Sequence, residues 1–128
     1  TLMFQQEVAE RICSEPDCAA YGRLSVLAQW ICEARIVMRL PPAAFTPPPK
    51  VWSAVVSLIP KATQPDPATF ARMEALTAAA FGQRRKMLRG ALRAVGGETL
   101  LARAGIAPDR RAETLSVAEF VRLMEASN

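Results

Sequence analysis

The sequence has 128 residues, of which 51% are hydrophobic and 22% charged, and its formal net charge is +4. This length suits one domain or two small ones, and this hydrophobic content is enough to bury a core, which excludes a disordered chain. No run of about 18 uncharged apolar residues occurs, so we expect no membrane segment and a cytoplasmic protein.

The first forty residues predict two strands and two helical segments. The pattern predicts a short strand over Leu2 to Gln5 and a helical turn or two over Glu7 to Ile12. Apolar residues at helical spacing predict a helix from Arg23 to Ile31. Partial alternation predicts a half-exposed strand from Ala34 to Leu40, and it places Ile36, Met38 and Leu40 on one face. The chain begins without methionine in an apolar strand pattern, so we expect a fragment whose first strand has an unpaired edge.

Tyr21 and Arg23 stand directly before and at the start of the predicted second helix. In that position either side chain can face a ligand. The alternative for both residues is a role in capping or packing the helix.

A proline-rich stretch, Phe45-Thr46-Pro47-Pro48-Pro49-Lys50, separates the second and third predicted strands. Consecutive prolines cannot extend a helix, so we expect a stiff, extended segment that displays Phe45. A displayed ring can stack on a base lifted out of its helix, and the alternative is that Phe45 plugs the core. The apolar run from Val51 to Ile59 predicts a strand buried on both faces.

The second half of the sequence carries only helical signals. Pro60 to Pro67 reads as a linker, and Asp66 with Pro67 predicts a helix that ends near Gly82. Further helices are predicted from Arg84 to Val95 and from Glu98 to Ala104, and a capping box at Ser116 opens a fourth, with Phe120, Leu123 and Met124 on its core side. The expected fold is therefore α/β plus all-α, divided at residue 62.

The surplus of positive charge lies in residues 61–128, which carry eleven basic and seven acidic side chains. Arg85, Lys86, Arg89 and Arg93 would share one face of the predicted second helix. This face is either a phosphate-binding stripe or an ordinary solvated surface. Arg84 falls on the apolar side, so the helix begins after it or Arg84 pairs with a buried acceptor.

Neither metal chemistry nor histidine-based catalysis is expected. The sequence contains no histidine, which removes Ser-His and Cys-His mechanisms. Its three cysteines, Cys13, Cys18 and Cys32, lack the spacing of a metal site, so we interpret them as structural or incidental thiols.

Several stretches together resemble one enzyme family. The stretch Phe45-Thr46-Pro47-Pro48-Pro49-Lys50-Val51-Trp52-Ser53 resembles the Phe-x-Pro-x-Pro-x-Val-x-Ser motif of rRNA adenine N6-methyltransferases. Tyr21-Gly22-Arg23-Leu24-Ser25-Val26 upstream, and Phe81 to Lys86 with Gly105 to Phe120 downstream, are similar to the small-subunit rRNA dimethyladenosine transferases. Antibiotic-resistance rRNA methyltransferases share the proline motif but not the downstream stretches, which favours the former group.

The resemblance implies a fold and an activity. Residues 1–62 would form the C-terminal part of a Rossmann-like class I methyltransferase sheet, whose last strand inserts antiparallel, and residues 63–128 a helical rRNA-binding subdomain. The activity would be transfer of methyl groups from S-adenosylmethionine to N6 of two adjacent adenines in small-subunit rRNA, within the immature small ribosomal subunit. The full-length protein would be a monomer.

The resemblance also implies roles for individual residues. Phe45 would stack on the flipped adenine, with Pro47, Pro49, Lys50, Tyr21 and Arg23 around the substrate, and Arg85, Lys86, Arg89 and Arg93 would bind rRNA phosphates. The family's cofactor-binding motifs are absent from these 128 residues, so the S-adenosylmethionine site is expected upstream of residue 1 and the chain alone is expected to be inactive. Two alternatives remain: a non-catalytic RNA- or ribosome-binding module, and part of a methyltransferase-derived transcription factor.

Overall fold

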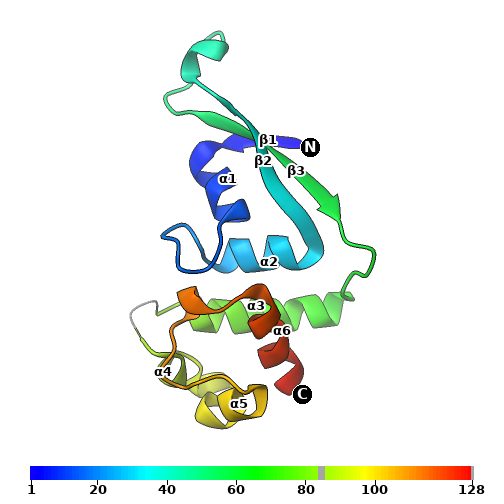
Figure 1. Ribbon diagram of the computed structural model, residues 1–128, viewed down its shortest axis with the longest axis vertical. Helices are drawn as coiled ribbons and strands as arrows, with labels where there is room; N and C mark the ends of the chain where they lie inside the picture. Colours follow the sequence, from blue (N-terminus) through cyan, green and yellow to red (C-terminus); the bar gives the residue numbers. More distant parts are fainter. Residues whose placement is uncertain (84–85, 128) are drawn as a thin grey trace.

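The computed structural model describes residues 1–83 and 86–127. A small sheet with two helices forms one half, and the remaining helices form the other, with α2 lying between them (Figure 1). The strands are β1 (Leu2–Gln5), β2 (Cys32–Leu40) and β3 (Ser53–Pro60). The helices are α1 (Gln6–Cys13), α2 (Arg23–Ile31), α3 (Pro67–Phe81), α4 (Leu88–Ala91), α5 (Gly97–Ala104) and α6 (Val117–Ala126), with 3-10 turns η1 (Pro42–Ala44), η2 (Arg93–Val95) and η3 (Ala112–Thr114).

The sheet has the order β1-β3-β2, and β3 runs antiparallel to both neighbours. Strands β1 and β2 are therefore parallel to each other, with β3 inserted between them, as the resemblance implied. Strand β1 lies at an edge of the sheet, and its Leu2 and Met3 are more than half exposed. This edge is the apolar one that the sequence predicted.

Two details of the predicted strands are wrong. Ile36 pairs with Val56 but Met38 pairs with the adjacent Val55, so a bulge at Val37 turns Met38 to the face opposite Ile36. Strand β3 is not buried on both faces, because α1 and α2 pack on the face that carries Ala54 and Val56, while Ile59 at its far end is exposed.

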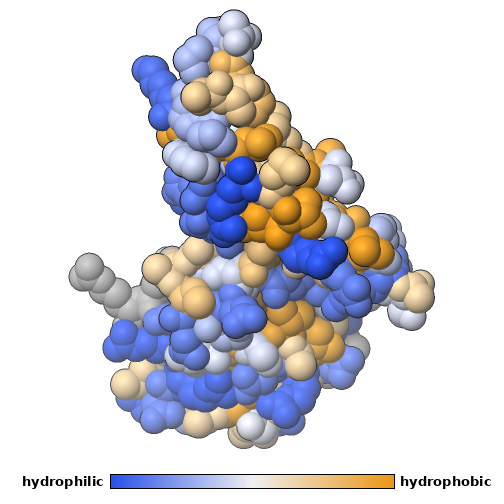
Figure 2. Space-filling view, turned by 45° about the horizontal axis from the view of Figure 1, so that its top comes forward, coloured by the Kyte–Doolittle hydropathy of each residue, from blue (hydrophilic) through white to orange (hydrophobic). Residues whose placement is uncertain are grey.

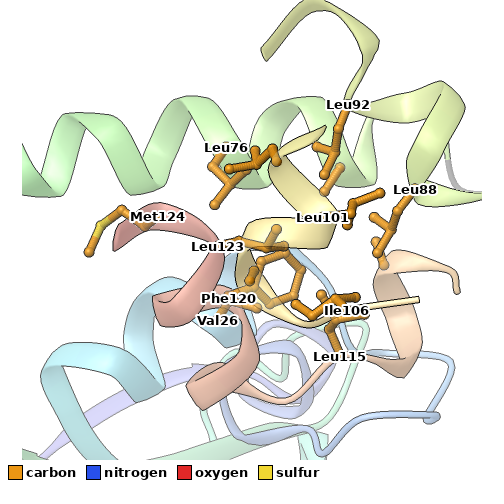
Figure 3. Close-up of a cluster of buried hydrophobic side chains, with 14 of the residues drawn as sticks. Val26, Leu76, Leu88, Leu92, Leu101, Ile106, Leu115, Phe120, Leu123 and Met124 are labelled. Carbon is orange, nitrogen blue, oxygen red and sulfur yellow. The ribbon is translucent and has the colours of Figure 1, made fainter. Parts of the chain in front are cut away.

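The helical half has its own apolar core, centred on Phe120 (Figure 3). Asp66 caps α3 through a bond from the Thr69 amide, and Ser116 with Glu119 forms the expected capping box at the start of α6. The cap at Ser116 begins α6 at a position that directs Phe120, Leu123 and Met124 into the core, as predicted. In the described part of the chain no strand follows β3, also as predicted.

The predicted helix from Arg84 to Val95 is wrong. The structure has the short α4 and the turn η2 instead, and residues 84 and 85 lie outside the described residues. Met87 is extended before α4, and the first amides of α4 are held by another segment: Leu88 N donates to Arg110 O at 2.7 Å and Arg89 N to Pro108 O at 3.1 Å. Gly96, with φ of 128°, ends η2 in a conformation that favours glycine.

Helix α2 belongs to both halves of the molecule. Its Val26, with Tyr21 just before it, is buried in the core of the helical half, while Ala28 packs against the sheet cluster. The linker is bound to its C-terminal end, because Lys61 Nζ donates to Gln29 O at 2.7 Å and Gln64 Nε2 to Ile31 O at 2.8 Å. The core of the helical half therefore includes two residues, Tyr21 and Val26, that precede the predicted division at residue 62.

Candidate nucleic-acid interface

The proline loop, residues 41–52, connects β2 to β3 at the end of the sheet where β1 and β2 finish. We call this end the carboxyl edge. Because β1 and β2 are parallel, their last residues, Gln5 and Leu40, lie at the same edge, and β3 begins there opposite both of them. Ligands of open α/β sheets bind outside the carboxyl ends of parallel strands. The loop therefore projects from the edge where such a ligand is expected, and it forms the tip of the molecule in Figure 1.

The loop is bent on both sides of the proline run, which was predicted to be a stiff, extended segment. It begins with the turn η1 and changes direction at residues 45–47 and 50–51, and the Thr46–Pro47 peptide is cis. Phe45 is half-buried, while Pro47, Pro49 and Lys50 are exposed. Part of the Phe45 ring is accessible, so both predicted roles, stacking and packing, are compatible with its position.

Tyr21 is not a surface contact. Its side chain is wholly buried, its hydroxyl donates to Leu115 O at 2.6 Å, and its ring meets Phe81 edge-on with 6.0 Å between centroids. Burial, together with the negative charge of Glu119, raises the pKa of the Tyr21 hydroxyl to about 12. The predicted substrate contact by Tyr21 is therefore corrected to the packing role, because its side chain joins the two halves.

Arg23 remains on the surface at the start of α2. Its guanidinium lies 3.8 Å from the Glu74 carboxylate, with both side chains nearly half exposed, so this pair contributes little to stability. Arg23 and Arg11 line the same shallow hollow beside the first turn of α2. Arg23 is therefore exposed toward solvent, while Tyr21, which lines the same hollow, is wholly buried.

Three of the four residues predicted to bind phosphate line one hollow on the helical half. We call it the basic hollow; its lining is Lys86, Met87, Arg89, Gly90, Arg93, Gly97 and Glu98, around a volume of about 600 Å³. Arg85, the fourth, lies outside the described residues, as does Arg84. Leu88 and Leu92 point inward from the same segment, so one side packs and the other is basic although the long helix is missing (Figure 3).

Arg110 holds the segment that begins α4 and carries the basic hollow, which the sequence did not predict. Its backbone carbonyl accepts from the Leu88 amide, while its guanidinium binds both carboxylate oxygens of Glu119 and donates to Thr114 O at 2.8 Å. This one residue thus fixes the start of α4 relative to the start of α6. The capping box at Ser116 was a sequence signal for Glu119, but no spacing rule pairs Glu119 with Arg110.

The Arg110–Glu119 pair predicts a pH dependence of stability. The hydrogen bond from Arg110 is the main cause that holds the pKa of Glu119 below its ordinary 4.5. A carboxylate whose pKa is lowered on folding stabilises the fold above its ordinary pKa, and this contribution is lost as the pH falls below it. We expect Glu119→Gln to lower the free energy of unfolding by about 1–3 kcal/mol at pH 7, the cost of a charged hydrogen bond.

Urea unfolding at pH 7 and at pH 3.5 measures this effect. The difference between the parent chain and Glu119→Gln should shrink at the lower pH, because below its ordinary pKa of 4.5 Glu119 is protonated in the unfolded chain and folding then gains less from the ionised carboxylate. Glu125→Gln, an exposed change on the same helix, is the control. An equal difference at both pH values would contradict the ionic role of Glu119.

Other kinds of site find no support in the described residues. Within residues 1–83 and 86–127, no group of three metal-ligating side chains comes together. None of the helices described there is long and apolar enough to cross a membrane. The three cysteines are free, and burial raises the pKa of the Cys13 thiol.

Comparison with known proteins places the chain in a family. The family model described as "Ribosomal RNA adenine dimethylase" matches residues 1–128. The chain belongs to this family. A member from Gluconobacter oxydans (strain 621H), named "Ribosomal RNA small subunit methyltransferase A", is 64% identical over 98% of this chain and 41% of its own length. The protein of the same name from Caulobacter vibrioides is 60% identical over 99% of this chain and 49% of its own length.

Solved structures agree with this dimethylase fold. A dimethyladenosine transferase from Plasmodium falciparum matches with a TM-score of 0.75 at 24% identity, over 95% of this chain and 54% of that protein. The 23S rRNA methyltransferase ErmE matches with a TM-score of 0.64 at 23% identity, over 97% of this chain and 52% of that protein. The chain spans less than half the length of the two curated relatives named above.

Proposed function

We propose that these residues act within an enzyme of the relatives' length, which transfers methyl groups from S-adenosylmethionine to N6 of two adjacent adenosines in small-subunit rRNA. The observation that carries the proposal is the proline loop at the carboxyl edge of the sheet, in a chain that matches the dimethylase family throughout. In this proposal Phe45 stacks on the extruded adenine, and Pro47, Pro49 and Lys50 hold it in place. The enzyme acts as a cytoplasmic monomer on the immature small ribosomal subunit.

The described residues do not fit S-adenosylmethionine, so no step is assigned to the cofactor here. A class I cofactor site needs a glycine-rich turn directly after a strand. Here β1 passes straight into α1, and β2 is followed by the proline loop. The residues of this chain bind and orient RNA in the proposal, and the cofactor is held elsewhere in the longer protein.

The basic hollow supports RNA as the substrate. Lys86, Arg89 and Arg93 are exposed and face one carboxylate, Glu98, in the lining of the hollow. This hollow lies in the helical half, while the proline loop lies at the opposite end of the long axis (Figure 1). A partner that contacts both must be as long as the molecule, as a folded RNA is and a free nucleotide is not.

The methyl-transfer activity is tested with the natural protein that contains these residues. Mixed with unmethylated small-subunit rRNA or immature subunits and labelled S-adenosylmethionine, it should place two methyl groups on N6 of each of two adjacent adenosines, as mass spectrometry of the digested RNA would show. RNA binding without methylation would support the alternative, a non-catalytic RNA- or ribosome-binding module. That alternative is favoured by one observation, the basic hollow in a chain whose described residues do not fit the cofactor.

The role of the basic hollow gives a prediction for RNA binding. Each lost phosphate contact should lower the slope of log affinity against log salt by roughly one unit. The triple variant Lys86→Gln, Arg89→Gln, Arg93→Gln should therefore bind small-subunit rRNA more weakly, with a slope about two to three units shallower. Filter binding from low to moderate salt measures it.

The control for this variant keeps the number of lost charges equal. Arg35, Arg39 and Arg103 are exposed and do not line the basic hollow, so their replacement by Gln removes the same net charge elsewhere. Equal slopes for the two triple variants would show that only net charge matters, and the hollow would then have no specific role.

A further inference from the structure

A further hollow lies at the carboxyl edge of the sheet, between the end of the proline loop and the start of α1. Its lining is Gln5, Gln6, Glu7, Glu10, Lys50, Val51 and Trp52, around about 420 Å³, and we call it the Trp52 hollow. The two segments that form it are tied together, because the Gln6 amide donates to Trp52 O at 2.9 Å and Gln5 pairs with Ser53. Its volume lies within the range of about 300–1,000 Å³ that small ligands occupy.

Trp52 presents an aromatic surface to solvent at the rim of this hollow. Its side chain is 48% exposed, as is that of Val51 beside it. The other tryptophan, Trp30, is half-buried and stacks on Phe70 with 5.8 Å between centroids. Hydrophobic surface also gathers on the sheet-bearing half in Figure 2, while the helical half is mostly hydrophilic. An exposed indole offers a flat face on which any base can stack.

The polar groups around Trp52 select a base and not a phosphate. Glu7 and Glu10 place two carboxylates in the hollow; Glu7 is paired with Arg11 at the surface, so the Glu10 carboxylate is the one that repels a phosphate. Gln6 Nε2 donates to Glu10 Oε1 at 3.0 Å, which orients that carboxylate. The amides and carboxylates provide donors and acceptors for the edge of a base, and Lys50 is the one cation in the lining.

We propose that the Trp52 hollow binds one unpaired nucleobase of an RNA strand, stacked on the Trp52 indole, with Lys50 at the adjoining phosphate. Phe45 and Trp52 belong to the same loop, so this base is in the same strand as the one on Phe45. The proposal rests on the proposed function, because it takes RNA as the substrate. Its new content is a second base-binding position at Trp52, where the proline motif specifies no residue type.

Tryptophan fluorescence tests the proposal directly. A short single-stranded RNA should quench the emission of the chain, and quenching should disappear in Trp52→Phe, where only Trp30 reports. Binding, followed by the anisotropy of labelled RNA, should persist in Trp52→Phe because its ring still stacks. In Trp52→Ala it should weaken by about 5- to 150-fold, the equivalent of one stacked base. Because residue 52 is exposed, both variants should keep the circular dichroism of the parent chain.

Two controls distinguish base stacking from other contacts. Val37→Ala, a similarly exposed change outside the Trp52 hollow, should leave the affinity within about twofold. An abasic oligonucleotide of the same length keeps the phosphates, so it should bind the basic residues without quenching Trp52.

The possible outcomes separate this proposal from the proposed function. RNA binding without quenching, quenching by the abasic strand, or equal losses in Val37→Ala and Trp52→Ala would overturn the base site alone. Failure to bind any RNA would overturn both the base site and the proposed RNA substrate.

Discussion

Phe45→Ala is expected to lower the turnover of the natural, full-length enzyme by about 5- to 150-fold, while rRNA binding stays nearly unchanged. This range corresponds to the loss of one base stacked on an aromatic ring. Phe45 is partly exposed in a loop at the carboxyl edge of the sheet, whereas the basic hollow, which we propose binds phosphate, lies at the other end of the molecule (Figure 1). Loss of the ring should therefore affect how the base is held and not how strongly the RNA is bound.

Single-turnover methylation and filter binding, measured on the same preparations, separate the two effects. Phe45→Tyr retains the aromatic face and should stay within a few-fold of the parent enzyme. Pro42→Ala, a change in η1 of the same loop, is the control for loop structure. If Phe45→Ala turns over at the parental rate, the ring packs the loop and does not hold the adenine.

Phe120→Ala is expected to have the largest effect on stability, a loss of about 3–5 kcal/mol in the free energy of unfolding. The ring is fully buried and stacks on Phe81 with 5.5 Å between centroids, and Phe81 in turn contacts Tyr21. Its removal leaves a cavity among side chains from α3, α5 and α6 that cannot all move inward (Figure 3). For a chain of this length the midpoint of thermal unfolding should fall by about 10–20 °C.

Urea and thermal unfolding followed by circular dichroism check this prediction. Phe120→Leu refills most of the cavity and should recover more than half of the loss. Val95→Ala, at an exposed hydrophobic position, should change the free energy of unfolding by less than about 1 kcal/mol. A loss below 1 kcal/mol in Phe120→Ala would mean that the helical core does not depend on this ring.

The sequence predicted those elements whose signals are local. Helix α2 begins and ends where its apolar spacing placed it, and α3 and α6 begin at their capping residues, because a cap and a periodic face are properties of neighbouring residues. The antiparallel position of β3 followed from the family resemblance. No local pattern distinguishes that arrangement from a hairpin.

The wrong predictions depend on contacts between distant residues. The segment after Gly82 has helical spacing, but carbonyls of Pro108 and Arg110 hold the amides of α4 and end the regularity. The bulge at Val37 appears only in the pairing with β3, and the exposure of β3 depends on which helices cover the sheet. The family resemblance implied a substrate contact for Tyr21, and residue type alone left packing as the alternative, because its hydrogen-bond partner, Leu115, lies 94 residues away in the sequence.

In the candidate site, the sequence predicted a role for Phe45 and for the three residues that the structure brings together in the basic hollow, from residue type and spacing. It did not identify Trp52 or Arg110. Trp52 stood inside a run interpreted as a buried strand, and Arg110 acts through a partner nine residues away. Both became visible only when the fold placed them beside Gln5 and Leu88 respectively.

The sharing of α2 between the two halves limits how this molecule can be divided for protein engineering. A polypeptide of residues 63–128 alone would lose Tyr21 and Val26 from its core. The Leu115 carbonyl would also lose the hydrogen bond that it accepts from the Tyr21 hydroxyl. Such an excised helical half would expose part of its own core to water and tend to aggregate. A portable RNA-binding unit should therefore include α2, so its boundary belongs before Tyr21 and not at the proline-rich linker.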